Sequence, residues 1–261
     1  MTLVDDLAKS AVFALIRFEG ADAVTMLTGT REAHERLVDI PLEHGVPHDG
    51  GRFDRLVFVP YRQISERGFE AHDDETPLAS MVIRDHREIP LEELLPQLPD
   101  LVVETLGESA FDIDDDAYAE MVGNVIRDEI GKGEGANLVI GRSYRATLAH
   151  WDVRRALSVF RRLLTEERGA YWTFLVFTGE RFLIGASPER HISVDSGRVR
   201  MNPISGTFRV GSATDTAARR SRFLDFLNDE KEIYELFMVV DEELKMMCDI
   251  CSEGVRSSAR T

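Results

Sequence analysis

Two carboxylates at helical spacing are candidates for a chemical role in this 261-residue chain. Glu232 and Glu235 stand three positions apart in NDEKEIYELFMVVDEEL (228–244), so one face of a predicted helix carries both. Carboxylates this close repel each other unless a cation lies between them, and Mg²⁺ binds in proteins through one or two carboxylates plus water and substrate. A solvated acidic helix face, balanced by Lys231 and Lys245, explains the same pattern.

A third carboxylate, Glu189, lies in ASPERHISV (186–194). The Ser-Pro-Glu turn between two predicted strands places it at the start of a strand. A carboxyl shielded from water there would have a raised pKa and could serve as a general acid. The alternative is a surface glutamate beside a turn.

The segment NPISGTFR (202–209) combines a strand end at Pro203 with three small residues, Ser205, Gly206 and Thr207. Backbone N–H groups and a hydroxyl in such a loop can approach a ligand carboxylate closely. The same sequence also fits an ordinary turn.

These segments need a framework of strands and one long helix. We predict strands at 171–179, 181–187, 190–196 and 198–204, and short connections such as Gly179-Glu180 and Ser196-Gly197 indicate antiparallel hairpins. One helix is predicted over 217–250. Its expected buried stripe consists of Ile233, Leu236, Phe237, Val240, Leu244 and Met247.

The first 110 residues are predicted to form strands and loops, with strands at 11–19 and 55–61. A helix with a cap at Asp114 to Asp116 follows, then a strand at 137–148 and an amphipathic helix at 152–166. Helices and antiparallel strands in mixed order predict an α+β fold, with layered antiparallel sheets and flanking helices.

The order of the three segments resembles one known family. Ser-Pro-Glu, then Pro-Ile-Ser-Gly-Thr-x-Arg, then Lys-Glu-x-x-Glu on a helix is similar to the chorismate-utilising enzymes of the anthranilate synthase component I type. The amino-acid sequence of these segments is most similar to the phenazine-pathway branch, which makes 2-amino-2-desoxyisochorismate. Leu236 fits that branch, because most of the superfamily has histidine there. The resemblance covers about residues 5–253.

The resemblance implies roles for individual residues. Glu189 matches the general acid that assists departure of the chorismate 4-hydroxyl, and Ser205, Gly206 and Thr207 match the loop that holds a substrate carboxylate. Glu232 and Glu235 match one carboxylate pair of an Mg²⁺ site. Asn137 stands where isochorismate and salicylate synthases use a lysine to activate water; asparagine cannot deprotonate water, which favours ammonia as the nucleophile.

The resemblance also sets expectations for the extent of the chain and for its partners. Residues 1–253 are expected to form the N-terminal part of a synthase domain, and 254–261 a disordered tail, for which a frameshift is the leading hypothesis. Ammonia is expected from a glutamine amidotransferase domain or subunit outside this chain, and the related enzymes suggest a homodimer. Two other interpretations stay open: a remnant that is inactive or depends on a partner, and an anthranilate synthase that releases pyruvate.

Composition narrows the partners and the location. A net charge of -16 argues against nucleic acid and anionic membranes as partners. No apolar run is long enough for a membrane span, and Asp5 and Asp6 precede the first apolar stretch where a secretory signal would be basic. We therefore expect a cytoplasmic protein. Cys248 and Cys251 lack a second ligand pair for zinc and are predicted to be ordinary reduced thiols.

Overall fold

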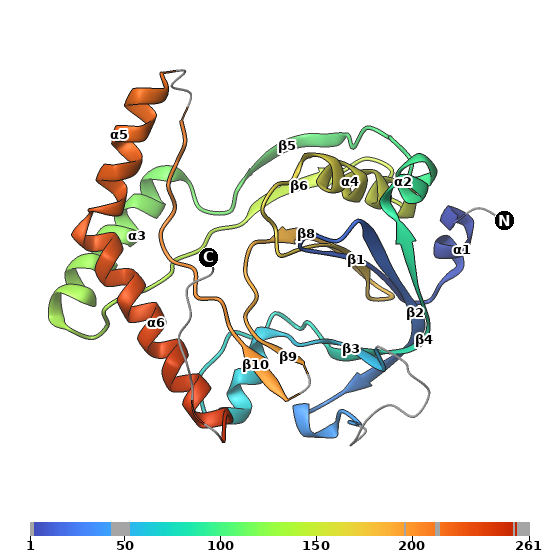
Figure 1. Cartoon of the computed structure of the whole chain (residues 1–261), viewed down its shortest axis with the longest axis horizontal. Coiled ribbons are helices and arrows are strands. Elements are labelled where there is room, and N and C mark those ends of the chain that lie inside the picture. Colours follow the sequence, from blue (N-terminus) through green and yellow to red (C-terminus); the bar gives the residue numbers. More distant parts are fainter. Residues whose placement is uncertain (1–2, 43–52, 196, 212–214, 253, 255–261) are drawn as a thin grey trace. The chain divides into compact units, whose positions relative to one another are not determined.

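The computed structural model describes residues 3–42, 53–195, 197–211, 215–252 and 254. It combines helices with antiparallel sheets, which confirms the predicted α+β class (Figure 1). The chain forms two compact units, one of residues 1–167 and 174–185, the other of residues 168–173 and 186–261. A single domain over 1–253 stays a prediction. Most of the expected tail, 254–261, lies outside the described residues.

A six-stranded sheet with the order β3-β4-β2-β1-β7-β8 is the main feature of the first unit. The predicted strands at 11–19, 171–179 and 181–187 are confirmed, whereas the two longest strands, β2 and β4, were not predicted. They pair antiparallel from Ala23 opposite Pro90 to His34 opposite Leu78. The bounds are β1 (Phe13–Phe18), β2 (Ala23–His34), β3 (Arg55–Phe58), β4 (Leu78–Pro90), β7 (Trp172–Phe177) and β8 (Phe182–Ser187).

Two helices pack their apolar faces into the core of this unit. α4 (Val153–Glu166) is capped by Asp152, whose side chain accepts a hydrogen bond from Arg155 N at 2.9 Å, as predicted. α1 (Leu3–Lys9) was missed, because only Leu3 and Leu7 mark its buried side. The short α2 (Leu91–Leu94) continues into a 3₁₀ turn at Leu95–Gln97. The buried core residues include Leu7, Phe13, Leu15, Val24, Leu94, Leu157, Phe160 and Leu175.

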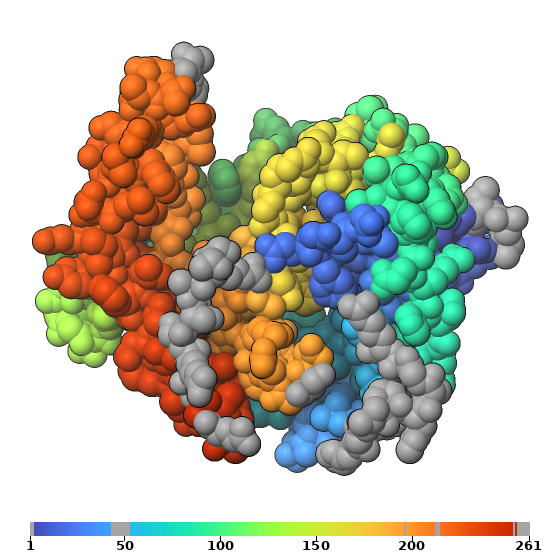
Figure 2. Space-filling model, viewed as in Figure 1, coloured from blue at the N-terminus to red at the C-terminus, as the bar shows by residue number. Residues whose placement is uncertain are grey.

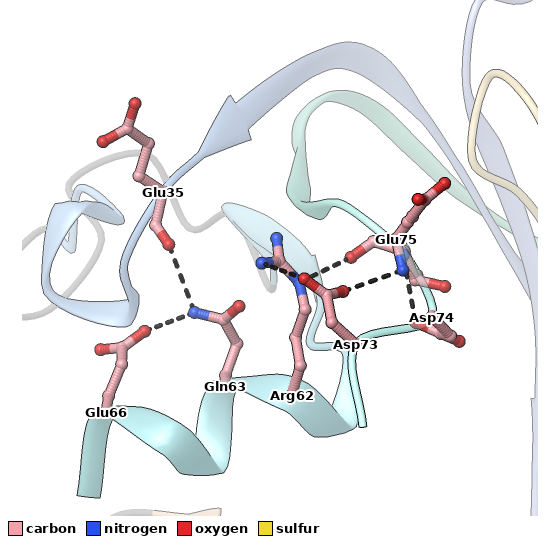
Figure 3. A network of polar contacts seen from close by, with 8 residues as sticks. Glu35, Arg62, Gln63, Glu66, Asp73, Asp74 and Glu75 are labelled. Atoms are coloured by element: carbon pink, nitrogen blue, oxygen red, sulfur yellow. Dashed lines mark hydrogen bonds and ion pairs between the residues drawn. The ribbon is translucent and has the colours of Figure 1, made fainter. Parts of the chain in front are cut away.

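After β3 a 3₁₀ helix replaces the rest of the strand that was predicted over 55–61. The strand ends at Phe58, and Pro60 precedes the 3₁₀ helix Tyr61–Arg67. Gln63, only 5% exposed, donates from Nε2 to the backbone oxygen of Glu35 at 3.3 Å and to Glu66 (Figure 3). These side-chain contacts hold the turn in place.

The segment between α2 and α4 contains a two-stranded sheet with a helix between its strands. The sheet pairs β5 (Thr105–Phe111) with β6 (Tyr144–Leu148). β5 was not predicted, and only the end of the expected strand 137–148 is a strand. α3 (Asp115–Asp128) begins as predicted, with Asp114 accepting from Ala117 N at 2.8 Å, and a 3₁₀ turn at Ile130–Lys132 follows it.

The second unit contains a short hairpin and two helices. β9 (Ser193–Asp195) pairs antiparallel with β10 (Arg198–Arg200), as expected, although both strands are shorter than predicted. Ser196 in the expected turn lies outside the described residues. Cys248 and Cys251 near the chain end are free thiols, in line with the prediction.

The single helix predicted over 217–250 is wrong. α5 (Thr216–Leu227) ends at Asn228, and α6 (Glu230–Ile250) begins after Asp229. Asp229 accepts a hydrogen bond from Lys231 N at 2.9 Å, so it caps a new helix. Asn and Asp favour such caps because their short side chains compete with the helical backbone for hydrogen bonds.

The expected buried stripe on this helix is also wrong. In the structure Leu236 is 45% exposed and Phe237 66% exposed, and much of α6 is open to view on the surface shown in Figure 2 (red). The better shielded side of α6 carries Glu232, Glu235 and Glu243 beside half-buried apolar residues, which include Val240, Leu244 and Met247 of the predicted stripe. The shielded side therefore mixes acidic and apolar side chains, and a hydrophobic pattern cannot reveal the acidic ones.

Candidate functional site

Gly206 in the loop before α5 lies directly against the carboxylate of Glu232 on α6. A β-carbon built on Gly206 would meet Oε2 of Glu232 at 2.4 Å, and the backbone φ of Gly206 is +69°. The positive φ favours glycine here, and any side chain at this position would have to displace the flexible end of Glu232. Phe208 anchors the loop to α5, because its ring centroid lies 5.2 Å from that of Phe223 and 5.7 Å from that of Phe226.

Lys231 provides a cation between the two predicted metal ligands. Its Nζ lies 2.8 Å from Oε1 of Glu232 and 3.2 Å from Oε2 of Glu235. Hydrogen bonds to Glu232 and then Glu235 raise the pKa of Lys231. The two glutamate side chains are 20% and 26% exposed, whereas Lys231 is 70% exposed. A shielded carboxylate pair thus faces a solvent-exposed ammonium group.

Glu232 and Glu235 are the two carboxylates at this place that could hold a cation. Oε2 of Glu232 is buried and has no hydrogen-bond partner among the described residues, so it is available to a cation or a ligand. Among all the described residues, no group of three or more Asp, Glu, His or Cys side chains is arranged to hold a metal. Mg²⁺ needs only one or two carboxylates when substrate and water supply the rest.

The start of α6 explains where these carboxylates stand. Asp229 is the cap, and Glu230 and Glu232 lie in the first turn, where the partial positive charge of the helix end favours negative side chains. Glu235 follows one turn later on the same side. Because α6 begins anew after Asp229, its first two turns contain the two predicted metal ligands.

The Ser-Pro-Glu segment bends after β8, but β9 begins only at Ser193, so Glu189 does not stand at the start of a strand as predicted. Ser187 Oγ accepts a hydrogen bond from Glu189 N at 3.3 Å and donates to the carbonyl of Glu189 at 3.4 Å. The side chain of Glu189 is exposed, so the shielding suggested by its position in the sequence is not present.

Sequence reasoning missed Glu243, the one residue of α6 that is fully buried. It is 8% exposed, and its Oε2 has no hydrogen-bond partner among the described residues. Burial raises the pKa of Glu243 and the negative charge of Glu189 raises it further, while His191 lowers it. The spacing from Glu232, eleven residues or about three turns, was the available signal that both share a face.

A comparison with known protein families identifies the family of this chain. Residues 11–260 match the model of the chorismate binding enzymes. The chain belongs to this family.

Relatives with curated descriptions support a finer placement within the chorismate binding enzymes. The chain is 49% identical over 238 residues to "Anthranilate synthase, phenazine specific" of Pseudomonas chlororaphis, and 47% identical over 236 residues to the protein of the same description from Pseudomonas fluorescens. Each alignment covers 90% of this chain but 36% of the relative. "Anthranilate synthase component 1" of Spirochaeta aurantia is 36% identical over 140 residues, 54% of this chain and 27% of that protein.

The remaining predicted residues of this family member lie in different surroundings. Ser205 is half-buried beside Gly206, and Thr207 is exposed. Asn137 is exposed in an irregular stretch before β6, in the first compact unit, whereas the other predicted residues belong to the second. The structure thus brings Gly206, Glu232 and Glu235 together, and the role of Asn137 stays a prediction.

No helix in the described ranges has both the length and the apolar character that crossing a bilayer would require.

Proposed function

We propose that this chain provides chorismate-binding and acid-catalytic residues for an Mg²⁺-dependent aminase. The reaction joins chorismate and ammonia to give 2-amino-2-desoxyisochorismate and water. The two phenazine-specific relatives support this product, since they align with 90% of the chain. The chain spans 36% of their length, so the activity of a complete enzyme is part of the proposal.

The single observation that carries the proposal is the contact between the Gly206 loop and the carboxylates of α6. Glu232 lies against Gly206, and Glu232 and Glu235 share one cation, the ammonium of Lys231. A loop that can hold an anion is therefore next to a pair that can hold a cation. A ring carboxylate bound through a metal needs both elements side by side.

In the proposed reaction each group has one task. Glu232 and Glu235 would hold Mg²⁺, which when bound would neutralise the ring carboxylate and withdraw electrons from the ring. The Ser205-Gly206-Thr207 loop would orient that carboxylate through backbone N–H groups and hydroxyls. Glu189 would donate its proton to the departing 4-hydroxyl, which leaves as water while ammonia forms a bond to C2. The added ammonia then loses a proton.

Ammonia at the site is proposed to come from a glutamine amidotransferase domain or subunit. Asn137 supports ammonia rather than water, because its amide cannot act as a base toward water. We further propose that two copies of the enzyme associate, as the resemblance implies.

A second candidate is anthranilate formation with loss of pyruvate. The descriptions "anthranilate synthase" and "anthranilate synthase component 1" among the relatives favour it. The two reactions share every step up to the aminated ring, so the same residues would serve both. Only the products separate them.

The test incubates the purified chain with chorismate, an ammonium salt and Mg²⁺, and identifies products by mass spectrometry. A mass matching 2-amino-2-desoxyisochorismate supports the proposal, and anthranilate with pyruvate supports the second candidate. Calorimetry with Mg²⁺ and chorismate supplies a readout that does not depend on turnover. If neither heat nor product is observed, the proposal fails for this chain, and the chain is a remnant that is inactive or depends on a partner.

The metal assignment has a matched control on the same helix. Glu232→Gln and Glu235→Gln should each abolish Mg²⁺ heat. Asp241→Asn and Glu242→Gln should not, since those side chains are 66% and 63% exposed. Equal loss in both pairs would mean that Mg²⁺ binds the acidic surface in general.

A further inference from the structure

Arg190, the residue after Glu189, connects the acid-bearing turn to the loop segment that precedes Gly206. Its Nη2 donates a hydrogen bond to Oδ1 of Asn202 at 2.8 Å. In the opposite direction the backbone N–H of Asn202 donates to the carbonyl of Arg190 at 3.3 Å. Two segments twelve positions apart are thus joined through both side chain and backbone.

The guanidinium group of Arg190 has a second contact that fixes its plane. Its central carbon lies 4.8 Å from the centre of the Tyr171 ring, which is within the range of a cation–π contact. Its Nε is buried and has no hydrogen-bond partner among the described residues. The group is therefore oriented by Asn202 on one side and by the aromatic ring on another, a combination that lysine cannot reproduce.

Asn202 is four residues before Gly206, so the connection reaches the cation site in a few steps. From Arg190 it passes to Asn202, along the loop to Gly206, and across to the carboxylate of Glu232. Farther along α6, Glu243 interacts with the turn again, because the negative charge of Glu189 raises the pKa of Glu243. Arg190 is the first connection in this series and the one nearest the proposed acid.

We infer that Arg190 is a positioning residue, which holds the turn carrying Glu189 and the Ser205-Gly206-Thr207 loop in one fixed arrangement. This inference rests on the proposed function, because it assigns a consequence for proton donation. Small displacements of a reacting group lower the rate strongly even where binding is kept. Substrate affinity should fall much less than the rate without Arg190, since the carboxylates of α6 keep their place and the loop keeps its residues.

A merely structural Arg190 would behave differently. Its loss would lower the fraction of folded protein and reduce kcat only in proportion to that fraction. It would not change the local motion of the loop in the molecules that stay folded. The test therefore measures loop motion and the separation of kcat from KM, at a temperature well below unfolding of every variant.

The first measurement is amide hydrogen exchange by NMR on the whole chain, without substrate. Arg190→Met and Asn202→Ala should each speed exchange at the amides of Glu189 and of position 202, which are hydrogen-bonded to Ser187 Oγ and to the carbonyl of Arg190, by about tenfold or more. Arg190→Lys should recover only part of the protection. The control is Arg198→Met, which removes an exposed arginine from β10 of the same unit and should change nothing at these amides.

The second measurement is steady-state conversion of chorismate with ammonium and Mg²⁺. Arg190→Met should lower kcat by about 10–100-fold with KM within threefold of the wild type. Adding Asn202→Ala to Arg190→Met should cost little more, because both changes break one connection.

The outcomes separate the inference from the proposed function. If the wild type converts no chorismate, the proposed function fails, and exchange alone decides whether Arg190 couples the two segments. If Arg190→Met leaves exchange at Glu189 and Asn202 unchanged, or lowers kcat no more than the folded fraction, the inference is wrong. Faster exchange at both amides together with a selective loss of kcat supports it.

Discussion

Oε2 of Glu232 occupies the space where a β-carbon on Gly206 would lie. The distance from that β-carbon position to Oε2 is 2.4 Å, far below a normal contact. The loop and the helix are therefore matched at one point, where a side chain of any size would push the carboxylate away.

Gly206→Ala should consequently weaken Mg²⁺ binding as well as stability. Gly197→Ala is the matched control: Gly197 has a φ of +77°, but a β-carbon added to it would meet nothing within 4 Å. Both variants should lose about 1–2 kcal/mol of unfolding free energy from the left-handed backbone. Only Gly206→Ala should also lower the Mg²⁺ affinity measured by calorimetry. Equal affinities in the two variants would contradict the contact.

Lys231→Met should tighten Mg²⁺ binding, because the ammonium bridging Glu232 and Glu235 must leave before a metal enters. We expect a two- to fivefold lower Kd, about the range of an exposed ion pair. Lys245→Met is the control. Its ammonium bridges Asp241 at 2.8 Å and Glu242 at 2.7 Å on the same helix, away from the site. A tighter Kd in both variants would point to a general effect of net charge.

Glu243→Gln should change the pH dependence of stability. The pKa of Glu243 is raised in the folded protein above its ordinary value of 4.5, so the folded state binds a proton more readily than the unfolded state. Stability of the wild type therefore falls as pH rises from about 4.5 through the folded pKa. The variant lacks this loss and should be more stable at pH 8, by about 1 kcal/mol, with no advantage at pH 4.

Urea unfolding at several pH values measures this difference, with the exposed neighbour Glu242→Gln as the comparison. A constant difference between Glu243→Gln and the wild type across the pH range would refute the role of the buried carboxyl.

Glu189→Gln should reduce kcat for chorismate by about 10²–10⁴-fold if Glu189 is the proton donor. Chorismate affinity in the presence of Mg²⁺ should stay within a few-fold, because glutamine keeps the size of the side chain. Asp195→Asn on β9 removes another exposed carboxylate and should keep the rate. An unchanged rate in Glu189→Gln would assign the proton donor elsewhere.

Local signals in the sequence were sufficient where local chemistry decides the structure. The caps Asp114 and Asp152 and the amphipathic helix at 152–166 were all predictable, because a capping side chain and a 3.6-residue period act within a few positions. The pairing of β2 with β4 was not predictable, because it joins residues that are 44 to 67 positions apart, along strands with mixed polarity.

The candidate site shows the same division. The carboxylates Glu232 and Glu235 follow from helical spacing, and the contact of Glu232 with Gly206 agrees with the order of motifs. The spacing from Glu232 places Glu243 on the same helix face, but its burial could not be foreseen, and neither could the partners of Arg190 in other segments. The exposed stripe with Leu236 misled the prediction, because a helical period says which residues share a face but not which face is covered.

The break between α5 and α6 has a consequence for how this site tolerates changes in length. Within one continuous helix, each inserted or deleted residue turns everything that follows by about 100°. Because α6 restarts at Asp229, an insertion in α5 leaves the direction of Glu232 and Glu235 from their own cap unchanged. An insertion between those two residues would rotate Glu235 away from its partner. The part of α5 before Phe223, which does not carry the rings that contact Phe208, can thus vary in length more freely among descendants of this sequence than the first two turns of α6.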